Sequence, residues 1–216
     1  MVHVVYTFLP AVDQPLRLDW GADNDPPAYR ERFERMASQG ARSRSRTGLW
    51  LLQQLLMGAG YPGETLARIG FNPAGRPEIA GAPAFSISHS EALVACALCD
   101  EGMIGLDVEY RRPRDMTRMA RLLDVAEQQH VAQQPLAFFD YWCAREATVK
   151  ASGRVGLKRI RALTLHGDTA HLDARAWPLR ALALADGYAA CLASDRAIEA
   201  VEISDLSDRL AGNTGR

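Results

Sequence analysis

The sequence has no long hydrophobic run and no strong excess of charge of one sign. No apolar stretch approaches the ~18 residues that a transmembrane helix needs, so we expect no membrane span. Its 25 basic and 26 acidic residues give a formal net charge of −1, whereas a general nucleic-acid binder normally carries a marked basic excess. These two absences argue against a membrane protein and against a nucleic-acid-binding protein.

The first residues also lack the pattern of a secretory signal peptide. Residues 1–6 contain neither a basic segment ahead of the apolar part nor a small-residue cleavage site, so they read as a first strand. Cysteine is scarce as well, and of the four cysteines Cys96 and Cys99 form a C-x-x-C pair. Residues three apart on a strand point to opposite faces, which prevents joint metal ligation. We therefore expect buried free thiols in a reducing compartment, the cytoplasm, rather than a zinc or redox site.

What the chain does have is an ordinary globular composition and a clear order of elements. Of its 216 residues 48% are apolar and 24% charged, so it can form one large domain or two of about 100 residues. Patterning predicts helices at 28–57, with a break near Gly40, at 115–133 and at 136–152. It predicts strands at 2–9, 85–88, 93–99, 103–110, 162–166, 170–173, 179–184 and 188–194. Such segregated elements favour an α+β fold, and a boundary near residues 100–104 would give two halves, 1–102 and 103–216.

Three acidic residues occur where they could share a magnesium ion. Asp107 and Glu109 are two apart in a predicted strand and so project from the same face. Trp142, Glu146 and Lys150 are four apart in a predicted helix and share one side. If that side meets the strand, three carboxylates converge beside a lysine. Mg²⁺ usually takes only a few carboxylates and leaves the remaining positions to water and phosphate oxygens, so the pattern indicates a Mg²⁺ site for a phosphorylated substrate.

Four separated segments resemble the motifs of the Sfp-like 4′-phosphopantetheinyl transferase family. They are Gly75-Arg76-Pro77, Phe85-Ser86-Ile87-Ser88-His89-Ser90, Gly105-Leu106-Asp107-Val108-Glu109 and Phe138-Phe139-x-x-Trp142-x-x-Arg145-Glu146-Ala147-x-x-Lys150. Each motif is weak alone, and G-x-D-x-E occurs by chance in many proteins. Their occurrence in the family's order over about 75 residues makes the resemblance specific. Arg44-Ser45-Arg46-Thr47 and Gly187-Tyr188 extend it more weakly.

The resemblance implies an enzyme that moves the phosphopantetheine arm of coenzyme A onto a serine of an apo-acyl or apo-peptidyl carrier protein. Adenosine 3′,5′-bisphosphate is released, and Mg²⁺ is required. It further implies a monomer in which two similar α+β halves form a pseudo-dimer, each half a small antiparallel sheet packed with a long helix, with coenzyme A between them. Holo-acyl-carrier-protein synthesis for fatty-acid, polyketide or nonribosomal-peptide pathways is the corresponding role, and the sequence does not say which carrier is used.

The resemblance also assigns roles to individual residues. Asp107, Glu109 and Glu146 would hold the metal, and Asp107 would also lie at the coenzyme A site. Lys150 and His89, with Ser88, would contact the pyrophosphate. The remaining coenzyme A contacts would be made by Arg76 and by two residues of a basic run expected ahead of a helix, Arg44 and Arg46.

Catalysis in this reading needs a base, because the nucleophilic serine belongs to the carrier. The chain itself contains no convincing Ser-His-Asp or Cys-His set. Glu127, Glu146 or a metal-bound water could take the serine proton, and Glu127 could equally be a surface residue. The family usually has lysine at the position of Arg145, and the two cations are not interchangeable at a tight phosphate site. We expect Trp142 to pack in the core.

A basic stretch beside the predicted metal strand is a candidate docking surface for an acidic carrier protein; its members are Arg111, Arg112, Arg114, Arg118 and Arg121. A solvated loop and helix face is the alternative explanation of these charges. For the whole chain, two other functions stay open at this point. One is a non-catalytic coenzyme A or nucleotide-binding protein of the same fold, and the other is a small metal-dependent hydrolase acting on nucleotides.

Overall fold

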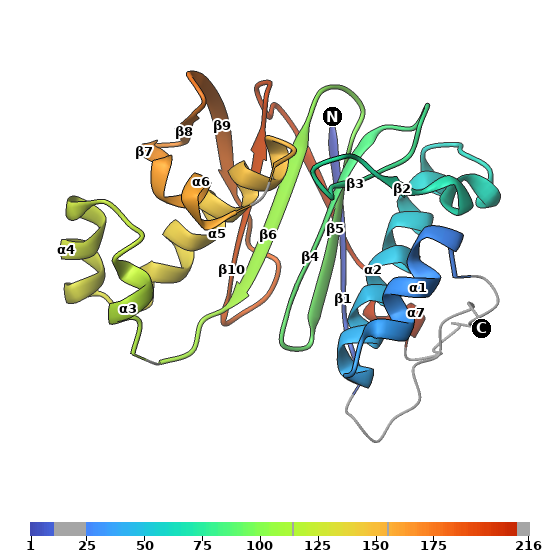
Figure 1. Ribbon diagram of the computed structural model, residues 1–216, viewed down its shortest axis with the longest axis horizontal. Helices are drawn as coiled ribbons and strands as arrows, with labels where there is room; N and C mark the ends of the chain where they lie inside the picture. The colour runs from blue at the N-terminus through green and yellow to red at the C-terminus, as the bar shows by residue number, and fades with distance from the viewer. Residues whose placement is uncertain (11–24, 114, 155, 211–216) are drawn as a thin grey trace.

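The molecule is built as four layers, in the order helix, sheet, sheet, helix. The computed structural model describes residues 1–10, 25–113, 115–154 and 156–210. Helix α2 (Gln39–Gly58) covers the outer face of one sheet, and helix α5 (Ala137–Ala151) covers the outer face of the other (Figure 1). The inner faces of the two sheets enclose a third core between them. The predicted α+β class is confirmed.

The first sheet has the strand order β11-β1-β5-β4. Strands β1 (Val2–Phe8), β5 (Leu93–Cys99) and β4 (Ala84–Ser90) pair antiparallel, whereas β11 (Val201–Asp205) adds parallel to β1. The last strand of the chain therefore completes the sheet that the first strand begins. The sequence did not predict β11, and the proposed division at 102/103 stays a prediction.

Strand β5 is buried on both faces because it lies between α2 and the second sheet. Cys96 belongs to the core under α2, and Cys99 belongs to the core between the sheets. The two thiols point to opposite sides, and all four cysteines are free and buried. The expectation that this C-x-x-C is not a joint ligand pair is confirmed.

The predicted long helix at 28–57 is two helices, α1 (Pro27–Arg35) and α2. The predicted break near Gly40 is confirmed and lies at residues 36–38, just before Gly40 in the first turn of α2. Ser38 is the reason, since its extended backbone and its Oγ, which accepts from Ala41 N at 3.4 Å, form the N-cap of α2. Short elements follow α2: a 3₁₀ helix η2 (Gly63–Arg68) and a two-stranded ribbon of β2 (Gly70–Phe71) and β3 (Pro77–Glu78).

The second sheet has the order β6-β10-β9-β8-β7. Its strands are all antiparallel and span Ile104–Tyr110 (β6), Tyr188–Ser194 (β10), Arg175–Ala181 (β9), Thr169–Leu172 (β8) and Thr164–His166 (β7). The strands at 103–110 and 188–194 agree with the sequence prediction. Strand β9 begins earlier than the predicted strand at 179–184.

Between β6 and α5 the chain forms α3 (Thr117–Ala120) and α4 (Val125–Gln133) in place of the single helix predicted at 115–133. The interruption has a local cause. Asp124 caps α4, accepting from Glu127 N at 2.9 Å, while Glu127 Oε2 accepts from Asp124 N at 2.9 Å. This reciprocal capping box fixes the start of α4. Helices α6 (Leu157–Ala162) and α7 (Ser207–Leu210) were not predicted. Within the described ranges, none of the helices has the length and apolar character needed to cross a membrane.

Candidate active site

The two sheets meet along their edge strands β4 and β6, which are joined by serine hydroxyls in place of a backbone ladder. Alternate residues of β4 point at β6, and each hydroxyl accepts one amide of that strand. The pairs are Ser86 with Leu106 N, Ser88 with Val108 N and Ser90 with Tyr110 N, at 2.9, 3.3 and 3.0 Å. We call Ser86, Ser88 and Ser90 the serine ladder. Sequence reasoning assigned a role only to Ser88, although the alternation S-x-S-x-S is visible in the chain.

Asp107 is the most enclosed of the three predicted metal ligands, with 5% of its surface exposed. Its Oδ1 accepts from Lys150 Nζ at 2.7 Å and from Ser88 Oγ at 2.9 Å. Its Oδ2 is buried and has no hydrogen-bond partner among the described residues. A buried carboxylate oxygen without a donor is costly, so this atom is chemically suited to a cation.

Helix α5 brings Glu146 and Lys150 to this strand, as the four-residue spacing predicted. Gly105 allows the close approach, because a Cβ there would lie 2.0 Å from Ala147 O. Lys150 Nζ reaches Ser88 Oγ at 3.0 Å and Leu106 O at 3.1 Å in addition to Asp107. Strand β4, strand β6 and helix α5 thus meet at one ammonium group.

Burial and the negative charges of Asp107 and Glu109 affect the pKa of Glu146. Burial of Glu146 raises its pKa, and the nearby negative charges of Asp107 and Glu109 raise it further against the opposing effect of Lys150. Glu109, on the same face of β6 as Asp107, accepts from Ser90 Oγ at 3.0 Å through Oε2. Clustered carboxylates raise one another's pKa in this way when no cation neutralises them.

The donor set fits Mg²⁺, which binds oxygen ligands from a few carboxylates. Among the residues that the structure describes, however, no three His, Cys, Asp or Glu side chains are already gathered at metal-binding spacing. Instead, the Lys150 ammonium neutralises part of the charge at Asp107. The ligand roles of Asp107, Glu109 and Glu146 remain predictions.

A cavity of about 340 Å³ opens beside these residues, between α2, β4 and the end of α5. Residues of α1, α2 and β4 line it together with Lys150 and Gly153 from the end of α5. His89 stands at its wall, where loss of hydration lowers the pKa of the imidazole and the positive charges of Arg44 and Lys150 lower it further. A concentration of positive charge that disfavours a protonated histidine is a setting that attracts phosphate groups.

The three arginines predicted to contact coenzyme A, Arg44, Arg46 and Arg76, lie in different surroundings. Arg44 and Arg46 lie within α2 rather than ahead of it, and Arg46 forms a salt bridge with the buried Asp25 at 2.5 Å. Arg76 lines the cavity, and its guanidinium donates to three backbone carbonyls from both halves, those of Phe85, Ile104 and Ala151 at 3.4, 3.1 and 3.2 Å. Arg76 therefore ties the halves together at the cavity, whatever else it binds.

Arg145, which stands where the family usually has lysine, is 1% exposed, and both of its terminal nitrogens are hydrogen-bonded. Nη1 donates to Ile160 O and Leu163 O at 2.9 and 2.7 Å, and Nη2 donates to Glu127 Oε2 at 2.5 Å. The carbonyls belong to the end of α6, so one guanidinium joins α4, α5 and α6. A planar fork of donors suits this task.

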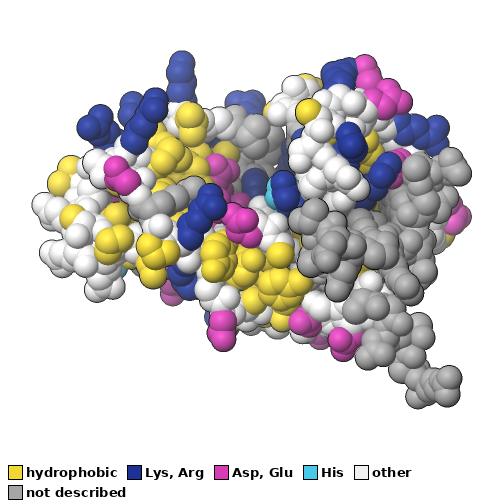
Figure 2. All heavy atoms as spheres, turned by 90° about the horizontal axis from the view of Figure 1, so that it is seen from below, with side chains coloured by type: hydrophobic (Ala, Val, Ile, Leu, Met, Phe, Trp, Pro, Cys, Tyr) yellow, Lys and Arg dark blue, Asp and Glu magenta, His cyan; other side chains and the backbone are white. Residues whose placement is uncertain are grey.

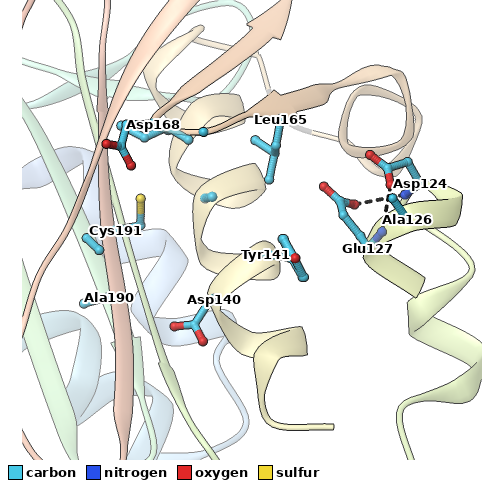
Figure 3. Close-up of a pocket in the computed structure, with 13 residues that line it drawn as sticks. Asp124, Ala126, Glu127, Asp140, Tyr141, Leu165, Asp168, Ala190 and Cys191 are labelled. Atoms are coloured by element: carbon cyan, nitrogen blue, oxygen red, sulfur yellow. Dashed lines mark hydrogen bonds between the residues drawn. The ribbon is translucent and has the colours of Figure 1, made fainter. Parts of the chain in front are cut away.

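Glu127 is correspondingly a buried residue, with 5% of its surface exposed. Figure 3 shows its carboxylate, together with Asp124 and Tyr141, at a second cavity of about 460 Å³ between α4, α5 and the second sheet. The surface alternative for Glu127 is thus wrong, and its role as a base stays a prediction. Trp142 is half-buried and stacks on Phe138 at an interplanar angle of 19°, which agrees with a packing role.

The basic stretch is only partly available to a partner. Arg111 bonds to Asp140 and to Tyr188 O, and Arg112 pairs with Glu91 at 2.8 Å. Arg118 and Arg121 are exposed, and Arg114 lies outside the described residues.

Comparison with known proteins indicates one family. Residues 103–193, which include β6, α5 and β10, match the family model of the 4′-phosphopantetheinyl transferase superfamily. The resemblance inferred from the four motifs is confirmed.

Individual relatives carry the same name. The chain is 34% identical over 126 residues to 4′-phosphopantetheinyl transferase AcpT of Salmonella typhimurium, covering 54% of this chain and 62% of that protein. It is 32% identical over 119 residues to 4′-phosphopantetheinyl transferase HetI of Nostoc, covering half of each, and 31% identical over 87 residues to 4′-phosphopantetheinyl transferase psf-1 of Bacillus pumilus, covering 37% of each. The matched segments thus span less than two thirds of these relatives.

Proposed function

We propose that this protein is a 4′-phosphopantetheinyl transferase that uses coenzyme A as the donor and a serine of an apo-carrier protein as the acceptor. The observation that carries the proposal is the junction of β4, β6 and α5, where Asp107, Lys150 and Ser88 are in mutual contact beside a cavity with basic walls. These residues come from three of the four motifs that the family shares.

Asp107, Glu109 and Glu146 would hold Mg²⁺. The ion would neutralise charge on the pyrophosphate of coenzyme A during transfer. Displacement of Lys150 from Asp107 Oδ1 toward the phosphates would open the carboxylate to the metal. The protein would then present one ammonium to the substrate and three carboxylates to the cation.

The chain's own residues would chiefly position and neutralise the substrate, as is general in phosphoryl transfer. Lys150, His89 and Ser88 would contact the pyrophosphate. Arg46 and Arg44 would meet the 3′-phosphate, and Arg76 would lie near the adenine and the phosphates. The carrier serine oxygen would attack the phosphorus next to the pantetheine arm, and the bond to adenosine 3′,5′-bisphosphate would break. That nucleotide leaves with the electron pair of the broken bond.

The serine proton would pass to a carboxylate of the site. Glu146 is the first candidate because it shares the face of α5 that brings Lys150 to the site. Glu127 is the second candidate, but it is held in a buried salt bridge with Arg145 and lines the second cavity rather than the one beside Lys150.

The acceptor would be an acidic, helical carrier protein. Exposed Arg118 and Arg121 supply positive charge beside the site, and Figure 2 shows hydrophobic side chains exposed in the middle of the face seen from below. Such a mixture suits a transient complex steered by charge. Binding that does not weaken with salt would count against this surface.

We also propose that the enzyme is of the Sfp-like type, working as a monomer whose two halves, 1–102 and 103–216, are structurally similar. Each half contributes the long helix, α2 or α5, that covers one sheet, which supports the proposal, although β11 of the second half adds to the first sheet. Four free cysteines support a reducing compartment, and we place the protein in the cytoplasm.

A transfer assay tests the function. The protein is incubated with coenzyme A, Mg²⁺ and a panel of apo-carriers, and the carriers are analysed by mass spectrometry with the Asp107→Asn variant as control. We expect the phosphopantetheine mass on at least one carrier with the wild type and none with the variant. Tight coenzyme A binding without transfer to any carrier would favour the non-catalytic alternative, and coenzyme A cleavage without a carrier would favour a hydrolase.

A further inference from the structure

The edge of β6 that faces β4 presents amides that no backbone carbonyl of β4 accepts in a ladder. The other edge of β6 pairs with β10. Buried amides must find acceptors, and Ser86 and Ser88 provide them for Leu106 and Val108. Ser90 accepts the more exposed amide of Tyr110 in the same way. The contact between the two halves at this seam therefore depends on side chains.

A serine hydroxyl has one proton to donate and two acceptor positions. When it accepts an amide of β6, its own proton is still available. Ser88 gives that proton to Asp107, and Ser90 gives it to Glu109. In both cases the carboxylate belongs to the residue immediately before the amide donor, so one hydroxyl reaches both groups.

Ser86 makes the same kind of contact without a carboxylate. It accepts from Leu106 N at 2.9 Å, and the residue before Leu106 is Gly105, which has no side chain. The chain therefore contains two serines with equivalent backbone roles, Ser86 and Ser90, of which only Ser90 touches a predicted metal ligand.

We infer that Ser90 is a positioning residue for the metal site: it fixes the Glu109 carboxylate by using the docking of β4 on β6. The inference rests on the proposed function, because it assumes that Glu109 binds the cation. Serine suits the position because alanine would lose both bonds, whereas threonine would keep the hydroxyl. Groups that orient metal ligands typically change metal affinity by about 10–100-fold when they are removed.

The test is the affinity for Mn²⁺, a substitute for Mg²⁺, measured by isothermal titration calorimetry with saturating coenzyme A. Wild type, Ser90→Ala, Ser90→Thr, Ser86→Ala and Asp107→Asn are compared, and the melting temperature of each is recorded. We expect Ser90→Ala to raise the Mn²⁺ dissociation constant about tenfold or more, and Ser90→Thr to restore it. Ser86→Ala should leave the constant unchanged although it loses a buried amide bond of the same seam and should melt earlier.

Equal Mn²⁺ affinities of Ser86→Ala and Ser90→Ala would overturn the inference, because the effect would then come from the seam alone. If Asp107→Asn abolishes binding at the same time, the proposed metal site still stands and only the role of Ser90 fails. If the wild type binds no Mn²⁺ with coenzyme A present, the metal site itself is wrong, and the role of Ser90 falls with it.

Discussion

Lys150 Nζ lies 2.7 Å from Asp107 Oδ1, and this ion pair joins the end of α5 to the middle of β6. The Asp107 side chain is 7% exposed and the Lys150 side chain 26% exposed, so solvent screens the pair only in part. The ammonium lies against the carboxylate proposed for the cation. A cation bound as proposed would therefore have to share this carboxylate with Lys150.

Replacing Lys150 by methionine should expose this competition. Without the ammonium, Asp107 keeps a buried negative charge with little compensation, and we expect a loss of roughly 2 kcal/mol of unfolding free energy in metal-free buffer. Because a cation can then occupy the vacated side of the carboxylate, Mg²⁺ should raise the melting temperature of the variant more than that of the wild type. Thermal melts with and without Mg²⁺ measure the increase in melting temperature. Equal increases in the variant and in the wild type would contradict the prediction.

Arg145→Lys and Glu127→Gln separate a packing role from a catalytic one. An ammonium cannot reproduce the planar fork that binds Glu127 and the two α6 carbonyls. We expect both variants to lose about 1–3 kcal/mol of stability, with kcat of the folded fraction preserved. Denaturant unfolding and transfer kinetics on the same samples decide between the roles. A large fall of kcat in Glu127→Gln alone would make Glu127 the base.

Coenzyme A affinity should rise as the pH falls through the range of His89. In the free protein the pKa of His89 is below its usual value because of burial and the charges of Arg44 and Lys150. A bound phosphate would favour the protonated ring and raise that pKa. The gain in coenzyme A affinity therefore begins as the pH falls through the pKa of His89 in the complex, which is the higher of the two. It is complete below the pKa of His89 in the free protein. Calorimetric titration from pH 8 to pH 5 should show it in wild type, and His89→Gln should remove it.

Gly105→Ala should disturb the site through the backbone. Its new Cβ would meet Ala147 O at 2.0 Å and Ala151 N at 2.6 Å, both parts of the α5 backbone. Overpacking of this kind costs about 1–3 kcal/mol or more, and it should push β6 away from Glu146. Gly48→Ala is the matched control, because its Cβ would meet a methyl group of the Ile87 side chain rather than backbone atoms. Similar losses of stability and transfer in both variants would argue against this account.

The strands at the centre of the molecule were predictable because their signals are local. Residues 93–99 form an apolar run closed by turn residues, and Gly102 with φ +84° supplies the turn before β6. That Glu146 and Lys150 lie on the same side of α5 followed from their four-residue spacing alone. The division between α3 and α4 was also encoded locally, in the capping residues Asp124 and Glu127, but the apolar pattern was read across it as one helix.

The remaining features depend on contacts between distant parts of the chain. Strand β11 is held by parallel pairing with β1, about 200 residues away in sequence, and most of its residues are exposed, so its pattern is weak. The burial of Arg145 depends on carbonyls at the end of α6, which a helical pattern in α5 cannot reveal. The link from Ser90 to Glu109 likewise exists only when the two halves are docked.

The most direct test of the central claim is a crystal structure with coenzyme A and Mn²⁺, measured with anomalous scattering. The account predicts one anomalous peak within coordination distance of carboxylate oxygens from Asp107, Glu109 and Glu146, with the pyrophosphate of coenzyme A completing the coordination. Bound coenzyme A with no peak at these three side chains, or with the Lys150–Asp107 pair unchanged and the metal elsewhere, would contradict it.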